Sequence, residues 1–386
     1  MEQTFLPFHQ PDIGENEIRA VVETLRSGWL TTGPKVRQLE SDFADYLGCR
    51  HAVAVNSGTA ALHLALEAAG VHEGDEVIVP TMTFAATAEV VLYLKARPVL
   101  VDCSPDTLNI DPAHIEKAIS SKTKAIIPVH IAGQPCEMDR VIEIARKYSL
   151  KVIEDAAHAL PARYRGKAIG TIGDIGCFSF YATKTITTGE GGMVTTENDE
   201  YADRFRVMSL HGISRDAWKR YTNEGSWYYE IHFPGYKYNL SDIAAAIGIE
   251  QLKKCDRLWE ARTQIAAAYQ QAFADVPEIT LPRCVPLHQH AWHLYPIQLD
   301  LKRLRIGRAE FIEILKQKKI GTSVHFIPLH LHPYYRDNFG YQPNDFPVAS
   351  GVYEGSVSLP IYPRMTERHV EAVVAAVRDT IARSRR

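Results

Sequence analysis

The stretch 176-GCFSFYATKTITTGEGGMVTT-196 places a single lysine, Lys184, between a β-prone aromatic run and a loop of threonines and glycines. An isolated lysine is usually a solvated surface residue. A lysine in a partly desolvated pocket behaves differently, because burial disfavours the ammonium form and lowers its pKa. Its amine can then act as a nucleophile toward an aldehyde. The sequence on either side of the stretch decides which kind of lysine this is.

From about residue 52 to 200 the chain alternates short apolar runs with helical patterns. The apolar runs are HAVAV, DEVIVP, PVLVDC, KAIIPVH, KVIED and GCFSF, and the helical patterns are TAALHLALEAAG, TFAATAEVVLYLKA, DPAHIEKAIS and EMDRVIEIARKYSL. Asp111 and Pro112 form a helix start, with Asp as N-cap and Pro at the first helical position. Strands that are almost entirely apolar are typical of a mostly parallel sheet with helices on both faces. The sequence therefore predicts an α/β fold.

Downstream of this region the pattern changes. Residues 201–235 carry aromatic and charged residues without clear periodicity, which predicts a loop-rich insertion, and a long helical pattern with a bend then runs to about Phe273. Further on, HLYPIQLDL, the helical GRAEFIEILKQKK, VHFIPL and the helical TERHVEAVVAAVRDTIA indicate a small α+β domain. We expect a large α/β domain over residues 1–250, and a long connecting helix with the small domain over 251–386.

Composition limits the classes of function. The chain has 386 residues, of which 46% are hydrophobic and 23% charged, and its net charge of −3 offers no basic surface for nucleic acid. Its six cysteines include no C-x-x-C pair, which argues against a disulfide framework and a cysteine zinc site. The N-terminus lacks the features of a signal peptide, and no apolar run approaches the ~20 residues that span a bilayer. We expect a cytoplasmic protein without membrane insertion.

Ligands of open α/β sheets bind outside the carboxyl ends of the strands. After HAVAV, the residues Ser57, Gly58 and Thr59 lead directly into a helix, whose first N–H groups can hold a phosphate. An ordinary glycine turn with a capping hydroxyl is the alternative. After KVI comes Glu154-Asp155, with His158 three residues beyond Asp155. These residues either face a ligand or form a capping aspartate with a satisfied histidine.

The remaining strand ends complete a recognisable set. Ser179 and Lys184 follow CFSF, and Phe84 follows another strand and offers an aromatic face. Pyridoxal 5′-phosphate (PLP) needs a helix N-terminus for its phosphate, an acidic partner for its ring nitrogen and an amine for its aldehyde. The strand ends together predict a PLP site in which Lys184 binds the aldehyde.

The same residues lie in motifs that resemble the DegT/StrS family of sugar aminotransferases, PLP enzymes of fold type I (aspartate aminotransferase-like). The motifs are SGWLTTGP, NSGTAALHLAL, GDEVIVPTMTF, EDAAHA and FSFYATKTITTGEGG, in family order and over nearly the whole chain. The resemblance implies a large, mostly parallel seven-stranded sheet domain and a small C-terminal α+β domain. Within the family, HGISRDAWKRY, PGYKYNLSDIAAAIG and HAWHLYPI look most like UDP-4-amino-4-deoxy-L-arabinose aminotransferases.

The resemblance also implies roles for individual residues. Lys184 and Asp155 would be catalytic, Lys184 on the cofactor aldehyde and Asp155 at the ring nitrogen. The other cofactor contacts would come from His158 at the phenolic oxygen, Phe84 on the ring, and Gly58, Thr59 and Ser179 at the phosphate. Family members are homodimers with active sites at the subunit interface. Many have Asn-x-Arg where this chain reads Lys237-Tyr238-Asn239, so either Lys237 or Asn239 could reach the neighbouring cofactor.

The implied reaction is transamination of a nucleotide-linked keto sugar, at C4 of a UDP sugar, with L-glutamate as the amino donor. The product would serve amino sugar synthesis for lipopolysaccharide or another polysaccharide. The candidate substrate-binding residues are Thr31, Thr32, Lys219, Arg220, His325, His330 and Tyr334. Amination at C3 of a dTDP sugar is an alternative, and so is a sugar-nucleotide sensor that keeps the fold without turnover.

Other classes of enzyme fit the sequence less well. The histidine clusters 288-HQHAWH-293 and 325-HFIPLHLH-332 lack the H-E-x-x-H spacing of a zinc site. Neither a G-x-G-x-x-G after an early strand nor a G-x-x-x-x-G-K-[ST] loop is present, which argues against a nicotinamide enzyme and a P-loop ATPase. A PLP lyase or desulfurase would need a reactive cysteine or another acid over the cofactor, and nothing around Cys284 suggests that its thiol is activated.

Overall fold

A central seven-stranded sheet organises the computed structural model, which describes residues 5–213 and 228–386. In spatial order its strands are β1 (His51–Val55), β9 (Gly192–Thr196), β8 (Ile175–Ser179), β5 (Lys151–Asp155), β4 (Thr123–Ile126), β2 (Glu76–Pro80) and β3 (Arg97–Val101). Only β9 is antiparallel to its neighbours in this sheet. The predicted mostly parallel sheet is confirmed, and the carboxyl ends of six strands share one edge.

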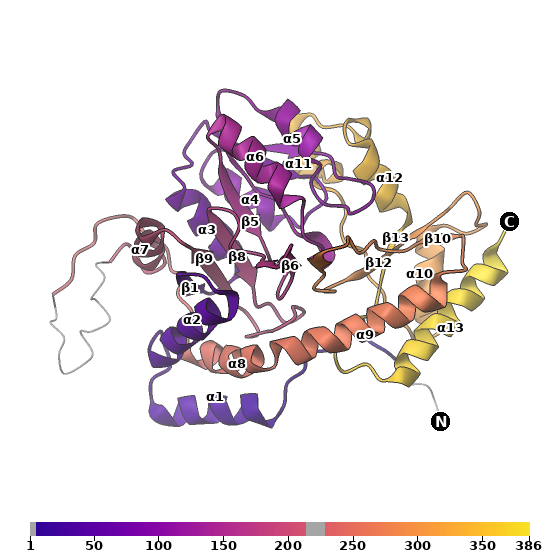
Figure 1. The fold of residues 1–386 in the computed structure, drawn as a ribbon, viewed down its shortest axis with the longest axis horizontal. Helices are drawn as coiled ribbons and strands as arrows, with labels where there is room; N and C mark the ends of the chain where they lie inside the picture. The colour runs from indigo at the N-terminus through magenta and orange to yellow at the C-terminus, as the bar shows by residue number, and fades with distance from the viewer. Residues whose placement is uncertain (1–4, 214–227) are drawn as a thin grey trace.

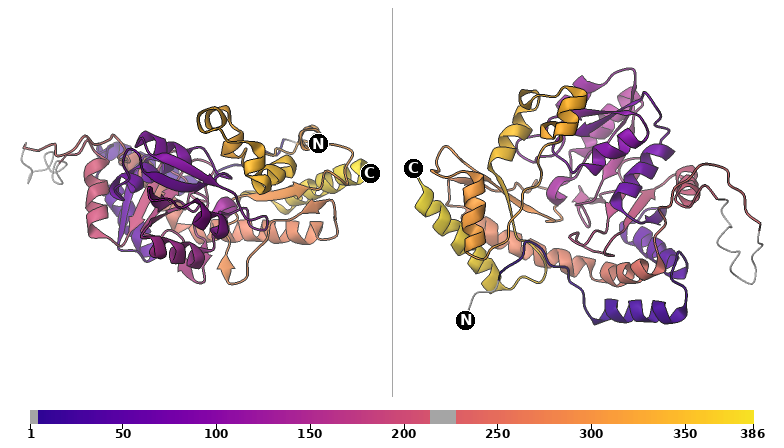
Figure 2. Two further views of the ribbon diagram at one scale, coloured as in Figure 1. Left: turned by 90° about the horizontal axis from the view of Figure 1, so that it is seen from above. Right: turned by 180° about the vertical axis from the view of Figure 1, so that it is seen from behind.

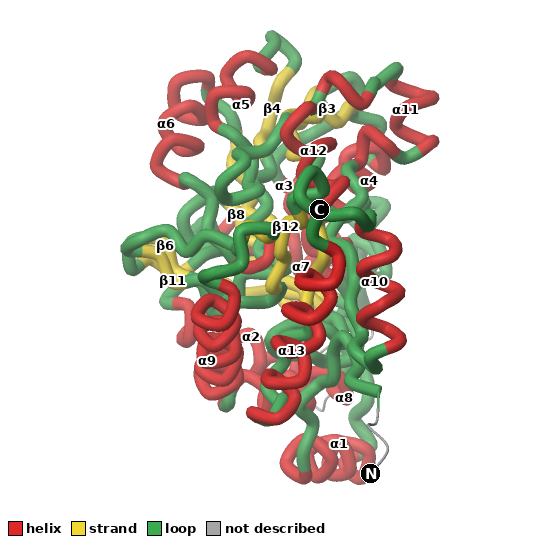
Figure 3. The backbone as a smooth tube through the Cα atoms, turned by 90° about the vertical axis from the view of Figure 1, so that its right-hand side faces the viewer, coloured by secondary structure: helices red, strands yellow, loops and turns green. Residues whose placement is uncertain are grey.

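Helices cover both faces of the sheet, as the apolar strands require (Figures 1 and 3). Along β1, Ala52 and Ala54 enter one core while Val53 and Val55 enter the other, because successive strand residues point to opposite faces. The first core contains α2 (Pro34–Leu47), α6 (Met138–Tyr148) and α8 (Asp242–Lys253), and the second contains α3 (Gly58–Ala68), α4 (Ala86–Tyr93) and α7 (Asp199–Met208). Helix α5 (Pro112–Ala118) begins as predicted, with the Asp111 side chain accepting from the Ala113 N–H at 2.9 Å.

Helix α7 corrects the prediction of a loop-rich insertion from residue 201. The Asn198 side chain caps it by accepting from the N–H groups of Glu200 and Tyr201, at 2.8 and 3.1 Å. Ala202 and Phe205 lie on the side of the helix that faces the sheet, and both are fully buried. The helical spacing in this segment is short and mixed with charge, so the pattern alone was too weak to indicate it.

The long helical pattern before Phe273 forms α8 and α9 (Cys255–Phe273), which meet in a bend at Lys254, as predicted. Helix α9 leads to a second sheet of β10 (Ile279–Thr280), β12 (Tyr295–Leu299) and β13 (Ser356–Leu359), covered by α10 (Arg308–Gln317) and α13 (Glu367–Ser384) (Figure 1). A third, small sheet joins β11 (His288–Gln289), β6 (Arg163–Tyr164) and β7 (Lys167–Ala168). Among the described residues no helix is long and apolar enough to cross a membrane.

Both ends of the chain pack away from their sequence neighbours. Near the N-terminus, α1 (Glu15–Ser27) lies along α8 (Figures 1 and 2). Leu6, by contrast, is buried in the core of the C-terminal sheet. The C-terminal elements η3 (Leu329–Leu331), α11 (Pro333–Phe339) and α12 (Pro347–Gly355) return to the large sheet, where Tyr335 and Ala349 enter its second core. The run VHFIPL leads into η3 and contributes no strand to the described residues.

Candidate active site

A cavity of about 620 Å³ opens at the edge where the carboxyl ends of the parallel strands meet. It is the place that the fold class predicts for a ligand. The predicted site residues that line it are Gly58, Thr59, Phe84, Asp155, His158, Ser179, Lys184 and His325. They come from the ends of β1, β2, β5 and β8 and from the C-terminal part of the chain, so the fold gathers one site from distant segments.

The start of α3 forms one wall of this cavity. Ser57 is the N-cap, and its side chain accepts from the Ala60 N–H at 3.0 Å. The first N–H groups of a helix have no intrahelical acceptor, so those of Gly58 and Thr59 are available to an anion. A Cβ at position 58 would lie 2.9 Å from the Ser179 Cβ, which shows how closely the end of β8 meets this helix start. Glycine is needed here for close approach.

Lys184 follows β8 in a turn whose backbone is fixed by the Lys184 N–H, which donates to the Tyr181 carbonyl at 2.9 Å. Loss of hydration lowers the pKa of its amine from 10.5 to about 8, and the charge of Asp155 only partly opposes this shift. More of the amine is therefore neutral near neutral pH than in a solvated lysine. Lys184 is the desolvated kind of lysine, and not a solvated surface residue.

Asp155 ends β5 and is buried. Its carboxylate accepts from the Thr87 hydroxyl at 2.8 Å and from the Ala157 N–H at 3.1 Å. Burial nevertheless raises the pKa of Asp155, although these two hydrogen bonds and Lys184 oppose the shift. A cation in the cavity would stabilise the ionised carboxylate, because an opposite charge favours the charged form.

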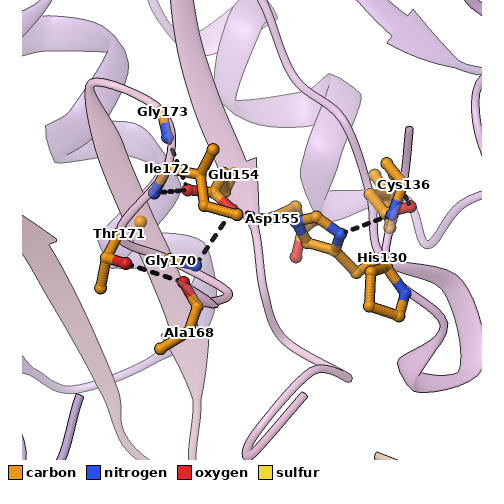
Figure 4. A network of polar contacts seen from close by, with 12 residues as sticks. His130, Cys136, Glu154, Asp155, Ala168, Gly170, Thr171, Ile172 and Gly173 are labelled. Atoms are coloured by element: carbon orange, nitrogen blue, oxygen red, sulfur yellow. Dashed lines mark hydrogen bonds and ion pairs between the residues drawn. The ribbon is translucent and has the colours of Figure 1, made fainter. Parts of the chain in front are cut away.

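Glu154, the neighbour of Asp155, is held away from the cavity in a network of its own (Figure 4). Its carboxylate accepts from the N–H groups of Gly170, Ile172 and Gly173 at 3.0, 2.8 and 2.7 Å. The His130 Nε2 lies 3.2 Å from it, and the His130 Nδ1 accepts from the Cys136 N–H at 3.0 Å. Since Nδ1 is occupied as an acceptor, His130 donates from Nε2. These bonds fix the end of β5 and therefore the backbone of Asp155.

His158 lies on the cavity wall between two aromatic rings. Its ring centroid is 4.4 Å from that of His293 and 5.7 Å from that of Phe326. The Ala132 N–H donates to its Nδ1 at 3.3 Å, which leaves Nε2 as the protonated nitrogen. Burial lowers the pKa of His158 well below its usual value, with Lys184 and His325 adding to the effect. His158 is thus a neutral hydrogen-bond donor.

Several predicted residues lie outside the cavity. Lys237 Nζ donates to the Asn239 side chain at 2.7 Å, and Asn239 Nδ2 donates to the Thr32 hydroxyl at 2.7 Å. Thr31, next to this chain of contacts, is exposed. The structure therefore joins Lys237, Asn239 and Thr32 to one another, and these three and Thr31 are not among the residues that line the cavity of their own chain.

His330 and Tyr334 are also not among the residues that line the cavity. His330 is buried, and its two ring nitrogens are occupied by the hydroxyls of Thr81 at 2.7 Å and Ser350 at 3.0 Å, so it is a satisfied core histidine. Tyr334 is exposed at the start of α11. Lys219 and Arg220 lie outside the described residues.

The cavity also contains residues that the sequence patterns did not single out: Phe8, His9, Thr83, Thr87, Tyr181, His293 and Phe326. Thr87 is in the helical pattern after Phe84 and resembles an ordinary helix residue. His293 and Phe326 belong to the two histidine clusters, in which only His325 and His330 are predicted from the sequence to bind the substrate. Phe8 and His9 precede the first helix and carry no periodic signal.

The residues present fit PLP on three observations from the structure. The start of α3 exposes N–H groups beside Ser179, which suits a phosphate. Asp155 is a buried carboxyl with a raised pKa, and a cation beside it would favour its ionised form. Lys184 is an amine with a pKa of about 8, within the same cavity.

Comparison with known proteins identifies relatives over the whole length. The model of the DegT/DnrJ/EryC1/StrS aminotransferase family matches residues 11–378. The uncharacterized protein MJ1066 of Methanocaldococcus jannaschii is 55% identical over 385 residues and 100% of both chains. The spore coat polysaccharide biosynthesis protein SpsC of Bacillus subtilis is 51% identical over 378 residues, covering 98% of this chain and 97% of SpsC.

Solved structures agree with the sequence comparison. Spr1654 of Streptococcus pneumoniae, a proposed sugar aminotransferase seen in its PMP form, matches with a TM-score of 0.93 and 35% identity over 98% of this chain and 99% of that chain. Its PLP form matches with a TM-score of 0.92. Helicobacter pylori PseC, an aminotransferase involved in the biosynthesis of pseudoaminic acid, matches with a TM-score of 0.92 and 30% identity over 99% of this chain and 100% of that chain.

The fold is therefore that of PLP-dependent enzymes of fold type I, and PLP is the cofactor. The cavity that holds Lys184 and Asp155, together with the match over residues 11–378, makes this chain a member of the DegT/DnrJ/EryC1/StrS family of sugar aminotransferases.

Proposed function

We propose that the protein transfers an amino group from L-glutamate to C4 of a UDP-linked keto sugar, releasing 2-oxoglutarate and an amino sugar nucleotide. The observation that carries the transamination chemistry is the cavity that brings the Lys184 amine, the Asp155 carboxylate and the start of α3 together. The sugar class is supported by relatives named for polysaccharide and pseudoaminic acid biosynthesis. The UDP group, C4 and glutamate rest on the motif resemblance.

Each group in the cavity has a task in this proposal. When bound, PLP supplies an aldehyde for the amino group and a ring that draws electrons from the carbon that loses a proton. Lys184 would hold the aldehyde, and its freed Nζ would take the proton from the α-carbon of the donor and pass it to the cofactor carbon that carried the aldehyde. A pKa of about 8 suits both directions of this transfer near neutral pH. Asp155 would pair with the ring nitrogen, and His158 would donate to the phenolic oxygen.

The substrate sugar would bind beside the cofactor against His325 and Phe326, on the side of the cavity built by the C-terminal part of the chain. His325 Nδ1 lies 2.9 Å from the Ser358 hydroxyl, and burial lowers the pKa of His325 to about 4. It therefore offers the sugar a neutral ring. We propose from the motif resemblance alone that Lys219 and Arg220 bind the diphosphate.

We also propose a cytoplasmic homodimer with active sites at the subunit interface. Two aromatic residues that line the cavity are exposed in the single chain, Phe84 by 62% and Tyr181 by 46%. Exposed aromatic rings of this kind favour contact with a second protein surface over contact with water. Lys237, Asn239 and Thr32 are linked to one another on the surface, outside the cavity of their own chain. A second copy would use them at its cofactor.

The reaction is tested by a screen of UDP- and dTDP-linked keto sugars with glutamate, following 2-oxoglutarate release and product mass. We expect turnover with a UDP-4-keto sugar and none with the Lys184→Ala variant. Borohydride treatment of the loaded enzyme should leave the pyridoxyl tag on Lys184. Turnover only with a dTDP-3-keto sugar would select the alternative substrate, and unchanged absorbance under excess glutamate would favour the sensor.

The shared site is tested by mixing two inactive homodimers, Lys184→Ala and Asn239→Ala. If Asn239 serves the neighbouring cofactor, half of the redistributed dimers regain one complete site, which gives about a quarter of wild-type activity. A Lys184→Ala and Asp155→Asn mixture is the control, because both residues belong to the same cavity. Equal failure of both mixtures would contradict the shared site without affecting the reaction.

A further inference from the structure

The segment before α1 crosses the active site as a strap, which we define as residues 5–13. One end is fixed to the C-terminal sheet region, where the Leu6 N–H donates to the Lys319 carbonyl and the Gly321 N–H donates to the Leu6 carbonyl, both at 2.8 Å. A Cβ at position 321 would lie 2.8 Å from the Phe8 nitrogen. Glycine at this position therefore lets the strap lie against the body of the protein.

The other end of the strap is fixed to the bend between α8 and α9. Lys254 Nζ donates to the Asp12 carboxylate at 2.9 Å and to the Asp12 carbonyl, and it lies 2.7 Å from Glu17. Gln251 Nε2 also donates to the Asp12 carbonyl, at 2.7 Å. With both ends held, the middle of the strap has a defined path.

That middle part contains Phe8 and His9, which both line the cavity. The Phe8 ring stacks on His325, with ring centroids 5.3 Å apart. The His9 Nε2 lies 3.1 Å from the Ala182 carbonyl oxygen. Because a carbonyl only accepts, Nε2 must carry the proton. Ala182 is in the turn that Lys184 closes by donating to the Tyr181 carbonyl.

We propose that His9 is a positioning residue of the active site: by donating to the Ala182 carbonyl it fixes the turn that directs the Lys184 amine into the cavity. The strap is then part of the catalytic apparatus, and not only a chain end that packs on the surface. This inference rests on Lys184 as the amine that binds the cofactor. Burial, with the charges of Arg262 and Lys184, lowers the pKa of His9 to about 4, so the ring stays neutral and its tautomer constant.

The test compares His9→Ala with His9→Gln. Glutamine places an N–H donor near the position of Nε2, whereas alanine removes the donor and admits water to the turn. We expect His9→Ala to lower kcat about tenfold, the effect of one lost hydrogen bond, with KM for both substrates changed less than about twofold. His9→Gln should stay within about threefold of wild type.

A second measurement does not depend on turnover. In the cofactor-free protein, the pH dependence of Lys184 acetylation by acetic anhydride, followed by mass spectrometry, reports the pKa of the amine. We expect a midpoint near the value of about 8 in the wild type and in His9→Gln, and a midpoint moved toward 10.5 in His9→Ala. Val373→Ala, a cavity variant in the buried core of α13, controls for lost stability and should leave the midpoint unchanged.

Equal midpoints in His9→Ala and wild type, or equal losses in the alanine and glutamine variants, would overturn the positioning role. A wild-type enzyme that turns over no keto sugar would instead contradict the proposed substrate. It would leave the positioning role testable, because the acetylation midpoints of the variants can still be compared. A pyridoxyl tag on a residue other than Lys184 would remove the premise itself.

Discussion

The amine of Lys184 and the carboxyl of Asp155 share a cavity in which both lose hydration. Burial lowers the pKa of Lys184 to about 8 and raises the pKa of Asp155. Both groups are thus shifted toward their neutral forms while the cavity is without a cofactor. A cationic ring nitrogen beside Asp155 would restore its charge, so we propose that cofactor binding and chemistry both depend on this carboxylate.

Asp155→Asn removes the charge and keeps the shape of the side chain. We expect kcat to fall by about 10²–10³, the range seen when one preorganised electrostatic partner of a reaction is lost. Steady-state kinetics with glutamate and the accepted keto sugar measures this effect. Thr87→Val is the matched control, since it removes only the hydroxyl that donates to Asp155 at 2.8 Å, and it should cost about tenfold. A normal rate for Asp155→Asn would contradict the pairing with the ring nitrogen.

Lys184→Met should make the cofactor-free protein more stable at pH 7. The pKa of Lys184 is about 8 in the folded protein against 10.5 as its ordinary value, so between these pH values the unfolded chain binds more protons. Stability contributed by this group therefore rises with pH across that window, and the advantage of the methionine variant should shrink as pH rises from 8 to about 10.5. Thermal unfolding at several pH values measures this effect, with the exposed Lys122→Met as control. A constant difference across the window would show that Lys184 is not desolvated.

At the scale of the elements, glycines decide how closely β8, β9 and the start of α3 approach one another. Gly192 begins β9 and pairs with Val55 of β1 and with Ser179 of β8. A Cβ at position 192 would lie 2.4 Å from the Ser57 carbonyl oxygen and 2.9 Å from the Gly58 nitrogen. Backbone atoms cannot move aside as a flexible side chain can, so the helix start would have to shift.

Gly192→Ala should therefore weaken cofactor binding. We expect the dissociation constant for PLP to rise about tenfold or more, since a displaced helix start loses the equivalent of one hydrogen bond to the phosphate. Titration of the cofactor-free protein by absorbance measures this constant. Gly351→Ala in α12 is the control, because a Cβ there meets nothing within 4 Å and alanine favours a helix. An unchanged dissociation constant for Gly192→Ala would mean that the phosphate binds elsewhere.

At the scale of the whole molecule, the C-terminal part of the chain is connected back to the large sheet through Asp102. Asp102 follows β3, and its carboxylate accepts from the N–H groups of Val348 and Ala349 at 2.9 Å each. It thus caps α12 from a position more than 240 residues away in sequence. Tyr335 and Ala349 then pack into the core that also contains α3 and α4.

Asp102→Ala should release this connection. We expect a loss of about 2 kcal/mol in the free energy of unfolding, from the lost cap and its buried N–H groups. Hydrogen exchange should accelerate first in α12 and only weakly in α13, which belongs to another core. Asp102→Asn keeps one acceptor oxygen and should lose less stability. Uniform acceleration throughout the chain would argue against a local connection.

Much of the fold and of the cavity could be predicted from the sequence. Apolar runs such as HAVAV and KVIED mark strands covered on both faces, and parallel strands bring their carboxyl ends to one edge. These local patterns predict that Gly58, Asp155, Ser179 and Lys184 lie near one another, and all four line the cavity. The roles of these residues toward the cofactor stay predictions, which the variants above test.

Other features depended on contacts between distant segments. Nothing in the sequence places Phe8 and His9 against His325 and Ala182, because these contacts join segments more than 170 residues apart. Likewise His325 lines the cavity, whereas His330, five residues later, is satisfied in a core by Thr81 and Ser350. Secondary structure follows from local periodicity, so the amino-acid pattern was enough to specify most elements and the edge where the strand ends meet. The two chain ends, by contrast, pack against cores built from segments far away in the sequence. The side chains that they bring to the site could therefore be identified only in the folded chain.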